Sequence, residues 1–158
     1  MALTDHLNIA GRLTLSKWDQ KGRLIERREV SNDITLAGRD LVARLFNPQR
    51  ATEPIARVSE LRVGGSDRAF DPKLPGLVAP IGGPVAIGKI DEVEVSDDSG
   101  RLRKMLRLVA ELREGEGNGE LREAGLFTPE GLMYNRVTFD AVTKTSQFRL
   151  SLVWEITF

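Results

Sequence analysis

The sequence predicts a mainly β fold: an antiparallel β-sandwich or open barrel with one α-helix, about residues 35–46, packed against it. Three observations predict this. The last eleven residues, 148–158, are apolar at every second position, the period of a strand with one buried face. Other short segments alternate similarly between turns rich in Gly, Asp and Pro, and only one segment has helical apolar spacing. The 158 residues fit a single β-rich domain, 1–158.

The first thirty residues predict a hairpin. Residues 7–15 alternate between apolar and polar, with Gly11 in the apolar parity as a bulge or a point of close approach. The run DQKG at 19–22 has turn chemistry, and residues 24–30 form a mostly charged return strand. A strand of that composition is typical of a sheet edge.

The helix is predicted because the spacing of apolar residues changes over 35–46 from the two-residue period of a strand to helical spacing. Thr35 is the expected N-cap, and Asn47-Pro48 ends the helix. Gly38 weakens it by about 1 kcal/mol relative to Ala, so we expect packing against a sheet to hold it. The residues that share the apolar face are Ala37, Leu41, Val42, Leu45 and Phe46.

The centre of the chain predicts a strand, a long loop and a hairpin. Residues 55–63 alternate except at Val58. The density of Gly and Pro in 64–84 predicts a loop without regular structure. Residues 85–95 and 102–113 then predict two paired strands joined by the turn 96–100.

The remaining strands follow a glycine-rich loop at 115–119. Residues 121–127 and 132–139 predict a second hairpin around the turn 128–131. The strand 148–158 then completes the fold, with one face buried.

Composition excludes several classes of function. Twenty-three Lys and Arg balance 23 Asp and Glu, so we expect neither a nucleic-acid partner nor an anionic membrane surface. The absence of Cys excludes disulfides, thiolate metal sites and thiol nucleophiles. The first residues lack a secretory leader's pattern, and no segment approaches the ~20 apolar residues of a membrane span. We therefore expect no membrane insertion, synthesis in the cytoplasm and no cofactor.

Candidate catalytic patterns are incomplete. Residues 83–89 have the spacing of a phosphate-binding loop up to Lys89, but Ile90 replaces the magnesium-binding Ser or Thr and a strand follows. His6 is the only histidine and has no companion ligand. The acidic residues of 91–98 match no calcium loop, and a polar strand face explains them better.

Two further groups keep alternatives open. Glu111, Glu120 and Glu123 could pair for glycoside hydrolysis, although charges alternating along strands are usually solvated. Trp18 and Tyr134 could be exposed aromatic anchors for a ligand or a partner, whereas Trp154 shares the parity of the apolar core. We expect a protein that is not an enzyme.

Four segments carry a resemblance to a known group of proteins. They are NDITLAGRDLVARLF at 32–46, LRVGG at 61–65, GELREAGLF at 119–127, and the ending of 144–158, KTS followed by LVWEITF. Together they resemble small structural proteins encoded in the tail modules of bacteriophages and related tail-like particles. The resemblance covers most of the chain from about residue 32. It departs in the loop after Gly65, where Asp67, Arg68, Phe70 and Lys73 stand in place of small residues and Thr.

The resemblance implies a non-enzymatic virion structural protein, assembled in the bacterial host cytoplasm, at a tail, baseplate or fibre-attachment position. Its partners would be other copies of itself and neighbouring virion proteins, contacted through loops 64–84 and 114–119. The alternative is a carbohydrate-binding sandwich, a receptor-binding or capsid-decorating module that takes a glycan. The candidate interface or ligand residues are Trp18, Asp67, Arg68, Phe70, Asn118 and Tyr134.

Overall fold

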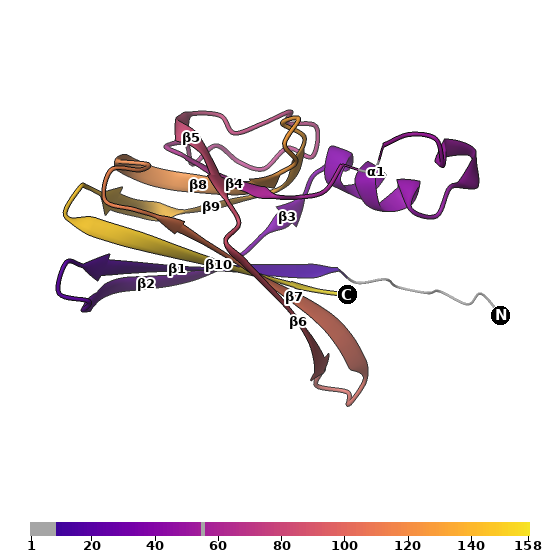
Figure 1. Ribbon diagram of the computed structural model, residues 1–158, viewed down its shortest axis with the longest axis horizontal. Helices are drawn as coiled ribbons and strands as arrows, with labels where there is room; N and C mark the ends of the chain where they lie inside the picture. Colours follow the sequence, from indigo (N-terminus) through magenta and orange to yellow (C-terminus); the bar gives the residue numbers. More distant parts are fainter. Residues whose placement is uncertain (1–8, 55) are drawn as a thin grey trace.

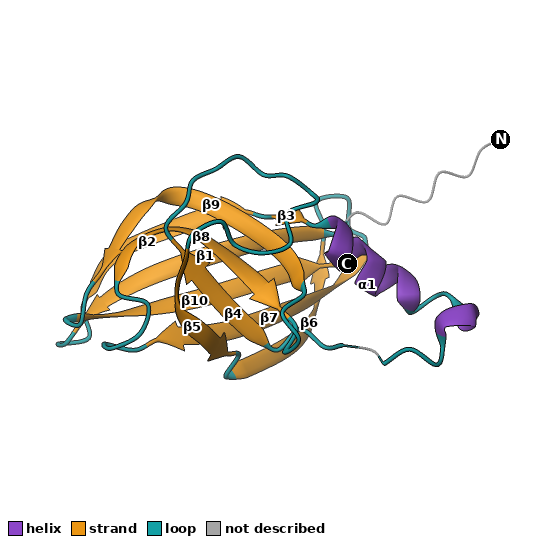
Figure 2. Ribbon diagram, turned by 90° about the horizontal axis from the view of Figure 1, so that it is seen from above, coloured by secondary structure: helices purple, strands orange, loops and turns teal. Residues whose placement is uncertain are grey.

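The computed structural model describes residues 9–54 and 56–158 and shows two antiparallel five-stranded sheets that face each other (Figures 1 and 2). The predicted β-sandwich with one α-helix is confirmed. Sheet A has the strand order β2 (Leu24–Ser31), β1 (Ala10–Asp19), β10 (Phe148–Thr157), β7 (Leu102–Leu112), β6 (Lys89–Ser96). Sheet B has the order β3 (Asp33–Ile34), β9 (Met133–Lys144), β8 (Gly119–Phe127), β4 (Glu60–Gly64), β5 (Pro80–Ala86). Helix α1 (Leu36–Arg44) and the 3-10 helix η1 (Pro48–Arg50) extend from one end of the sandwich (Figure 2).

The C-terminal strand lies at the centre of sheet A, as its pattern predicts. β10 pairs with β1 on one side and β7 on the other. Leu150, Leu152, Trp154 and Ile156 point into the core, and all four are buried. The ends of the strand are less covered: Phe148 is only half-buried, beneath the Lys17 ammonium, and Phe158 lies beyond the strand and is also half-buried.

The N-terminal hairpin is also confirmed, with a longer first strand than the pattern indicates. β1 continues to Asp19, and residues 7 and 8 lie outside the described part of the chain. β2 pairs with β1 and is an edge of sheet A. A Cβ at Gly11 would overlap the Asn32 side chain, so Gly11 marks a close approach. The Asn32 amide oxygen accepts a hydrogen bond from the Trp154 indole at 3.3 Å.

Helix α1 begins as predicted but packs differently. Thr35 is the N-cap, and its hydroxyl oxygen accepts a hydrogen bond from the Gly38 amide at 2.9 Å. The same hydroxyl donates to the Met133 carbonyl, which ties the helix to β9. The expected burial of the whole apolar face is wrong. Leu45 and Phe46 follow the last helical residue and are 61% and 78% exposed, because the chain there lies beyond the strands of sheet B (Figure 1).

The structure explains why glycine stands at position 38, which helix propensity alone does not. Gly38 is the buried residue of α1 and lies directly against the Tyr134 backbone carbonyl, where a Cβ would overlap the oxygen. Its small size allows the first turn of the helix to approach β9. The helix is therefore held mainly at its N-terminal turn.

Two predicted boundaries in the centre of the chain are wrong. The strand predicted at 55–63 is present only as β4, Glu60–Gly64; residue 55 lies outside the described residues. The loop predicted at 64–84 ends early, because Pro80–Ala86 form β5. β5 is an edge strand, where a proline costs no inner hydrogen bond, and its pairing with β4 is shifted between Leu61 and Val63.

The single strand predicted at 85–95 is in fact parts of two strands in different sheets. The chain leaves sheet B after Ala86 and enters sheet A at Lys89. The Gly88 amide donates to the Val109 carbonyl at 2.9 Å, which starts the predicted β6–β7 hairpin. The short strand β3 has no counterpart in the prediction, and β9 extends past residue 139 through a register shift in its pairing with β8.

Candidate interaction surfaces

An apolar groove of about 480 Å³ opens at the helical end of the sandwich. One wall is the helix lobe, which we define as residues 36–54 and 56–58, and it contributes Leu41, Leu45 and Phe46. The opposite wall is sheet A, with Ile90 on β6 and Ile156 on β10. The β6–β7 hairpin projects beyond the strands of sheet B (Figure 1), which leaves this end of the sandwich open.

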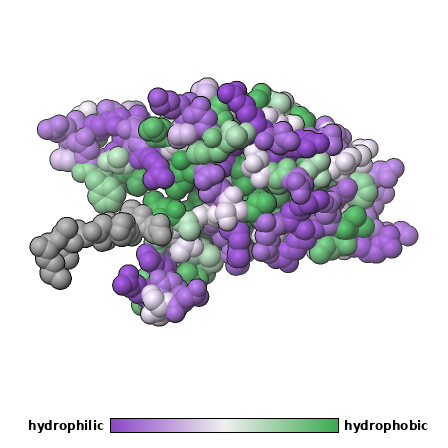
Figure 3. Space-filling view, turned by 180° about the vertical axis from the view of Figure 1, so that it is seen from behind, coloured by the Kyte–Doolittle hydropathy of each residue, from purple (hydrophilic) through white to green (hydrophobic). Residues whose placement is uncertain are grey.

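The groove gathers side chains that a folded monomer normally covers. Phe46 and Leu45 are largely exposed at its rim, and Ile90 is 56% exposed on the facing wall. The charged residue in the lining is Arg57. Figure 3 shows hydrophobic residues beside the helix lobe, between it and the hairpin. An exposed apolar surface of this kind typically marks a site of interaction.

Tyr134 lies at the base of this groove and not on a free surface. It is only 4% exposed, so the expectation of an exposed stacking ring is wrong. Burial raises the pKa of its hydroxyl, and the Arg39 charge acts in the opposite direction. The tight turn 128–131 misled the prediction, because the ring points back toward the helix that β9 supports.

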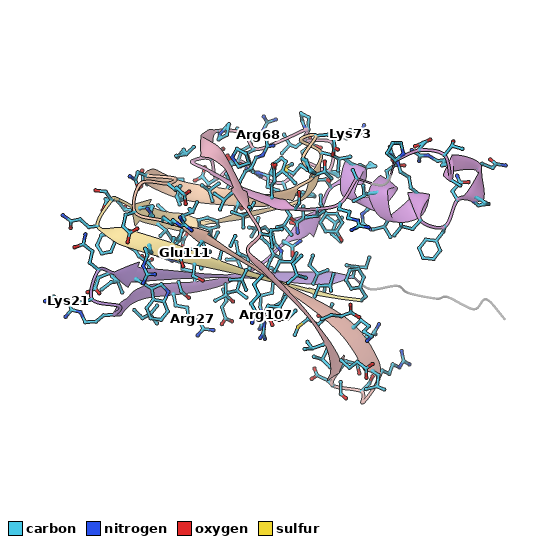
Figure 4. The ribbon with its side chains drawn as sticks, in the orientation of Figure 1. Lys21, Arg27, Arg68, Lys73, Arg107 and Glu111 are labelled. Carbon is cyan, nitrogen blue, oxygen red and sulfur yellow. The ribbon has the colours of Figure 1, made fainter. Side chains whose placement is uncertain are left out.

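A second surface is the loop 66–78, which covers sheet B. The Gly65 amide donates to the Ala79 carbonyl at 2.8 Å and closes the base of the loop. Asp67 and Arg68 are exposed, and Phe70 is half-buried. Figure 4 shows Arg68 and Lys73 on this loop, on the opposite side of the molecule from Arg27 and Arg107 of sheet A.

A buried ion pair beneath this loop fixes its conformation. Glu123 on β8 and Arg136 on β9 are 0% and 1% exposed, and their side chains meet at 2.8 Å. Glu123 also accepts hydrogen bonds from the Val78 and Ala79 amides, at 3.1 and 2.7 Å. Arg136 donates through Nη1 to the Arg68 carbonyl at 2.8 Å. The pair therefore holds the loop at both ends.

The three glutamates considered for hydrolysis do not form one site. Glu123 is engaged in the buried ion pair. Glu111 is exposed on β7 of sheet A, and Glu120 is exposed on β8 of sheet B, paired with Arg122. Each carboxylate is accounted for by a local ion pair, and they lie on two different sheets.

Lys144 anchors the other candidate loop. Its buried ammonium donates to the Arg113 carbonyl at 2.7 Å and the Asn118 side-chain oxygen at 2.9 Å. Burial lowers the pKa of this amine, against the opposite effect of Glu114 and Glu116. Asn118, a predicted interface residue, is exposed, and its side-chain oxygen accepts the hydrogen bond from Lys144. It is therefore an anchor of the loop.

The structure does not bring the six predicted residues together. Trp18 is half-buried on β1 of sheet A, paired with Arg149. The residues of loop 66–78 lie over sheet B. Asn118 contacts Lys144, and Tyr134 lies at the base of the groove. Sequence reasoning missed the groove, because Leu45 and Phe46 matched a core-facing helical stripe. The signal that marks them is Asn47-Pro48, which ends the helix before the stripe can reach a sheet.

Comparisons of the chain with protein-family models, curated proteins and solved structures gave no match. Across residues 9–54 and 56–158, no group of three or more His, Asp or Glu side chains is arranged to hold a metal ion. Over the same residues, no helix has the length and hydropathy needed to cross a bilayer.

Proposed function

We propose that this protein is a non-enzymatic structural subunit of a bacteriophage tail or related tail-like particle, at a tail, baseplate or fibre-attachment position. It acts through contacts with copies of itself and with neighbouring particle proteins. The apolar groove is the observation that carries this proposal, because Phe46, Leu45 and Ile90 expose apolar surface that a partner would cover. The particle itself is inferred from the sequence resemblance.

The resembling segments support the proposal in a second way, because their residues anchor the fold's surfaces. Thr35 and Gly38 belong to the first segment and dock the helix on β9. Glu123 belongs to the GELREAGLF segment, and Lys144 begins the last one; each holds a loop in place. A subunit that works through interfaces needs surfaces with a fixed shape, since ordering them on binding costs affinity.

The alternative function, carbohydrate binding, depends on exposed aromatic side chains that stack on a sugar. Of the two candidates, Tyr134 is buried, and Trp18 lies on the outer face of sheet A. A Trp18→Ala variant tests this alternative on a glycan array. A glycan bound by the original chain and lost by the variant would favour carbohydrate binding over the structural proposal.

Purified particles test the proposed function. Particles are released from cells that carry this sequence, banded on a density gradient and probed with an antibody raised against the chain. We expect the chain in the particle band, and we expect a strain with the sequence deleted to yield incomplete or non-infective particles. A chain found only in the soluble fraction, together with intact particles from the deletion strain, would overturn the proposal.

A further inference from the structure

We infer that the groove binds a second copy of this chain, with Phe46 of one copy entering the groove of the other. This inference rests on the proposed function, since it names the partner and the surface for contacts between copies. It also gives a use to the exposed apolar residues of the helix lobe.

The first argument is the shape of the apolar surface. Phe46 stands at the rim with 78% of its surface exposed, next to a groove of about 480 Å³ whose floor includes Leu108 and Tyr134. Burying an aromatic side chain removes roughly 150–250 Å² from water. Two copies that face each other at this end can each insert Phe46 beside Ile90 of the other. The same patch then meets itself, as a two-fold contact requires.

The second argument is the charge of the two walls. The helix lobe has four arginines and two carboxylates, whereas strand β6 has one lysine and three carboxylates. Within one chain, Arg44 and Arg50 pair with Asp40 and Glu53, Asp91 pairs with Lys89, and Glu92 and Glu94 share the Lys104 ammonium. The lobe therefore keeps an excess of two arginines and the strand an excess of one carboxylate, and a second copy seated on the groove brings these opposite excess charges together. Arg57 lies in the groove lining and forms no ion pair with the residues of 9–54 and 56–158. The whole chain is neutral, so copies do not repel each other.

The third argument concerns the other surfaces that could cover the groove. The carboxylates Asp91, Glu92 and Glu94 along β6 share two lysine partners, Lys89 and Lys104, and the negative charge left over opposes an anionic lipid surface. They also discourage strand addition at this free edge, because charged side chains protect sheet edges from pairing. A glycan needs hydrogen-bonding side chains, and the lining is apolar apart from Arg57 and the buried Tyr134. A copy of the chain satisfies both the apolar floor and the charged walls.

The test measures the mass of the full chain by sedimentation over concentrations from micromolar to hundreds of micromolar. We expect a monomer–dimer equilibrium, and we expect Phe46→Asp to weaken it at least tenfold. Ile25→Asp is the matched control, because Ile25 is a 50% exposed apolar residue on β2, at the edge of sheet A opposite from β6. Both side chains are exposed, so at concentrations where the original chain is monomeric each variant should melt close to the original temperature, which separates loss of association from loss of folding.

The charged walls and the contact itself are tested separately. Arg57→Glu and Glu92→Arg should each weaken the dimer, and the two changes together should recover part of the loss. Because the chain has no cysteine, single cysteines report proximity directly. Copies with Leu45→Cys mixed with copies with Ile90→Cys should cross-link through a short bis-maleimide, and Ile25→Cys should not.

Several outcomes would overturn the inference. These are a monomer at every concentration, a dimer that Phe46→Asp leaves unchanged, or cross-linking at Ile25 and not at Leu45. Each leaves the particle test of the proposed function standing. Conversely, a chain that dimerises through Phe46 but is missing from particles would overturn the proposed function and keep this inference.

Discussion

Replacing Glu123 by Gln should destabilise the protein strongly. In the structure the carboxylate accepts hydrogen bonds from the Val78 and Ala79 amides and from Arg136, and both charged side chains are buried. Glutamine leaves the Arg136 guanidinium buried without a counter-charge. Removing one partner of a buried pair costs about 3–5 kcal/mol, a large part of a total stability of roughly 5–15 kcal/mol. At about 2–4 °C per kcal/mol for a chain of this size, we expect Tm to fall by roughly 6–20 °C.

Thermal unfolding followed by circular dichroism measures this loss, and trypsin measures its location. The loop 66–78 offers cleavage sites at Arg68 and Lys73, both exposed, so release of the loop should speed cutting there. The control is Glu120→Gln on the same strand, because Glu120 is exposed and, among the described residues, pairs only with Arg122. That change should cost less than about 1 kcal/mol.

A double variant separates charge from packing. If the buried ion pair is the cause, Glu123→Leu with Arg136→Met should cost less than the sum of the two single changes, because no charge is left unpaired. Equal melting temperatures for Glu123→Gln and Glu120→Gln, with unchanged cutting at Arg68, would refute the reasoning about the anchored loop.

Three further predictions follow from the packing. Gly38→Ala should lower the free energy of unfolding in urea by about 1–3 kcal/mol, because a Cβ there overlaps the Tyr134 carbonyl. Gly76→Ala, where a Cβ meets open space, should leave stability unchanged, and equal losses in the two variants would contradict this account. Deleting residues 154–158 should abolish folding, since Trp154 is fully buried at the centre of sheet A; a truncated chain with the original Tm would contradict that burial. Lys144 should titrate below the other lysines in ¹³C NMR, because burial lowers its pKa. Between its folded pKa and 10.5 only the unfolded chain holds this proton, so its contribution to stability rises with pH; titration alongside the other lysines would refute it.

The elements that could be predicted from sequence are those whose period reflects one buried face. β10 shows this clearly, because alternation over residues 148–158 leaves one arrangement that buries Leu152 and Trp154. The N-cap Thr35 was also predictable, since capping is a local interaction between a hydroxyl and a backbone amide two or three residues later. Capping and strict alternation depend on residues close together in the sequence, so the sequence alone can predict them.

The crossing between sheets was not predictable for the same physical reason. Residues 85–95 predict one strand, with Val85, Ile87, Val93 and Val95 at one parity and Ile90 at the other, yet Ala86 belongs to sheet B and Lys89 to sheet A. A two-residue apolar period indicates that one face of a strand is buried, but it does not indicate which sheet the strand belongs to. Pro80 and Pro84 favour a loop over a strand in the sequence, but β5 is an edge strand, and an edge strand accepts proline.

The interaction surfaces show a related limit. Leu45 and Phe46 lie on the apolar stripe of the predicted helix, and periodicity indicates that these side chains share a face. Whether another element covers that face depends on where the sheets end, which is a long-range property. Glu123 was equally ambiguous, because a buried carboxylate and a solvated one look the same until its partner Arg136 is placed opposite.

The anchors and the groove are connected through the helix lobe. Thr35 and Gly38 fix the start of α1 on β9, and further along the lobe Arg50 donates hydrogen bonds to both Asp40 and Glu53. The bonds from Arg50 lower the pKa of Asp40, so the lobe keeps this ion pair through the neutral range. A rim that is ordered before binding loses little conformational freedom when a partner arrives, which favours association through the exposed Phe46. The residues that hold the lobe therefore contribute to binding without touching the partner, and weakening the Asp40–Arg50 contact should weaken association even though Phe46 is unchanged.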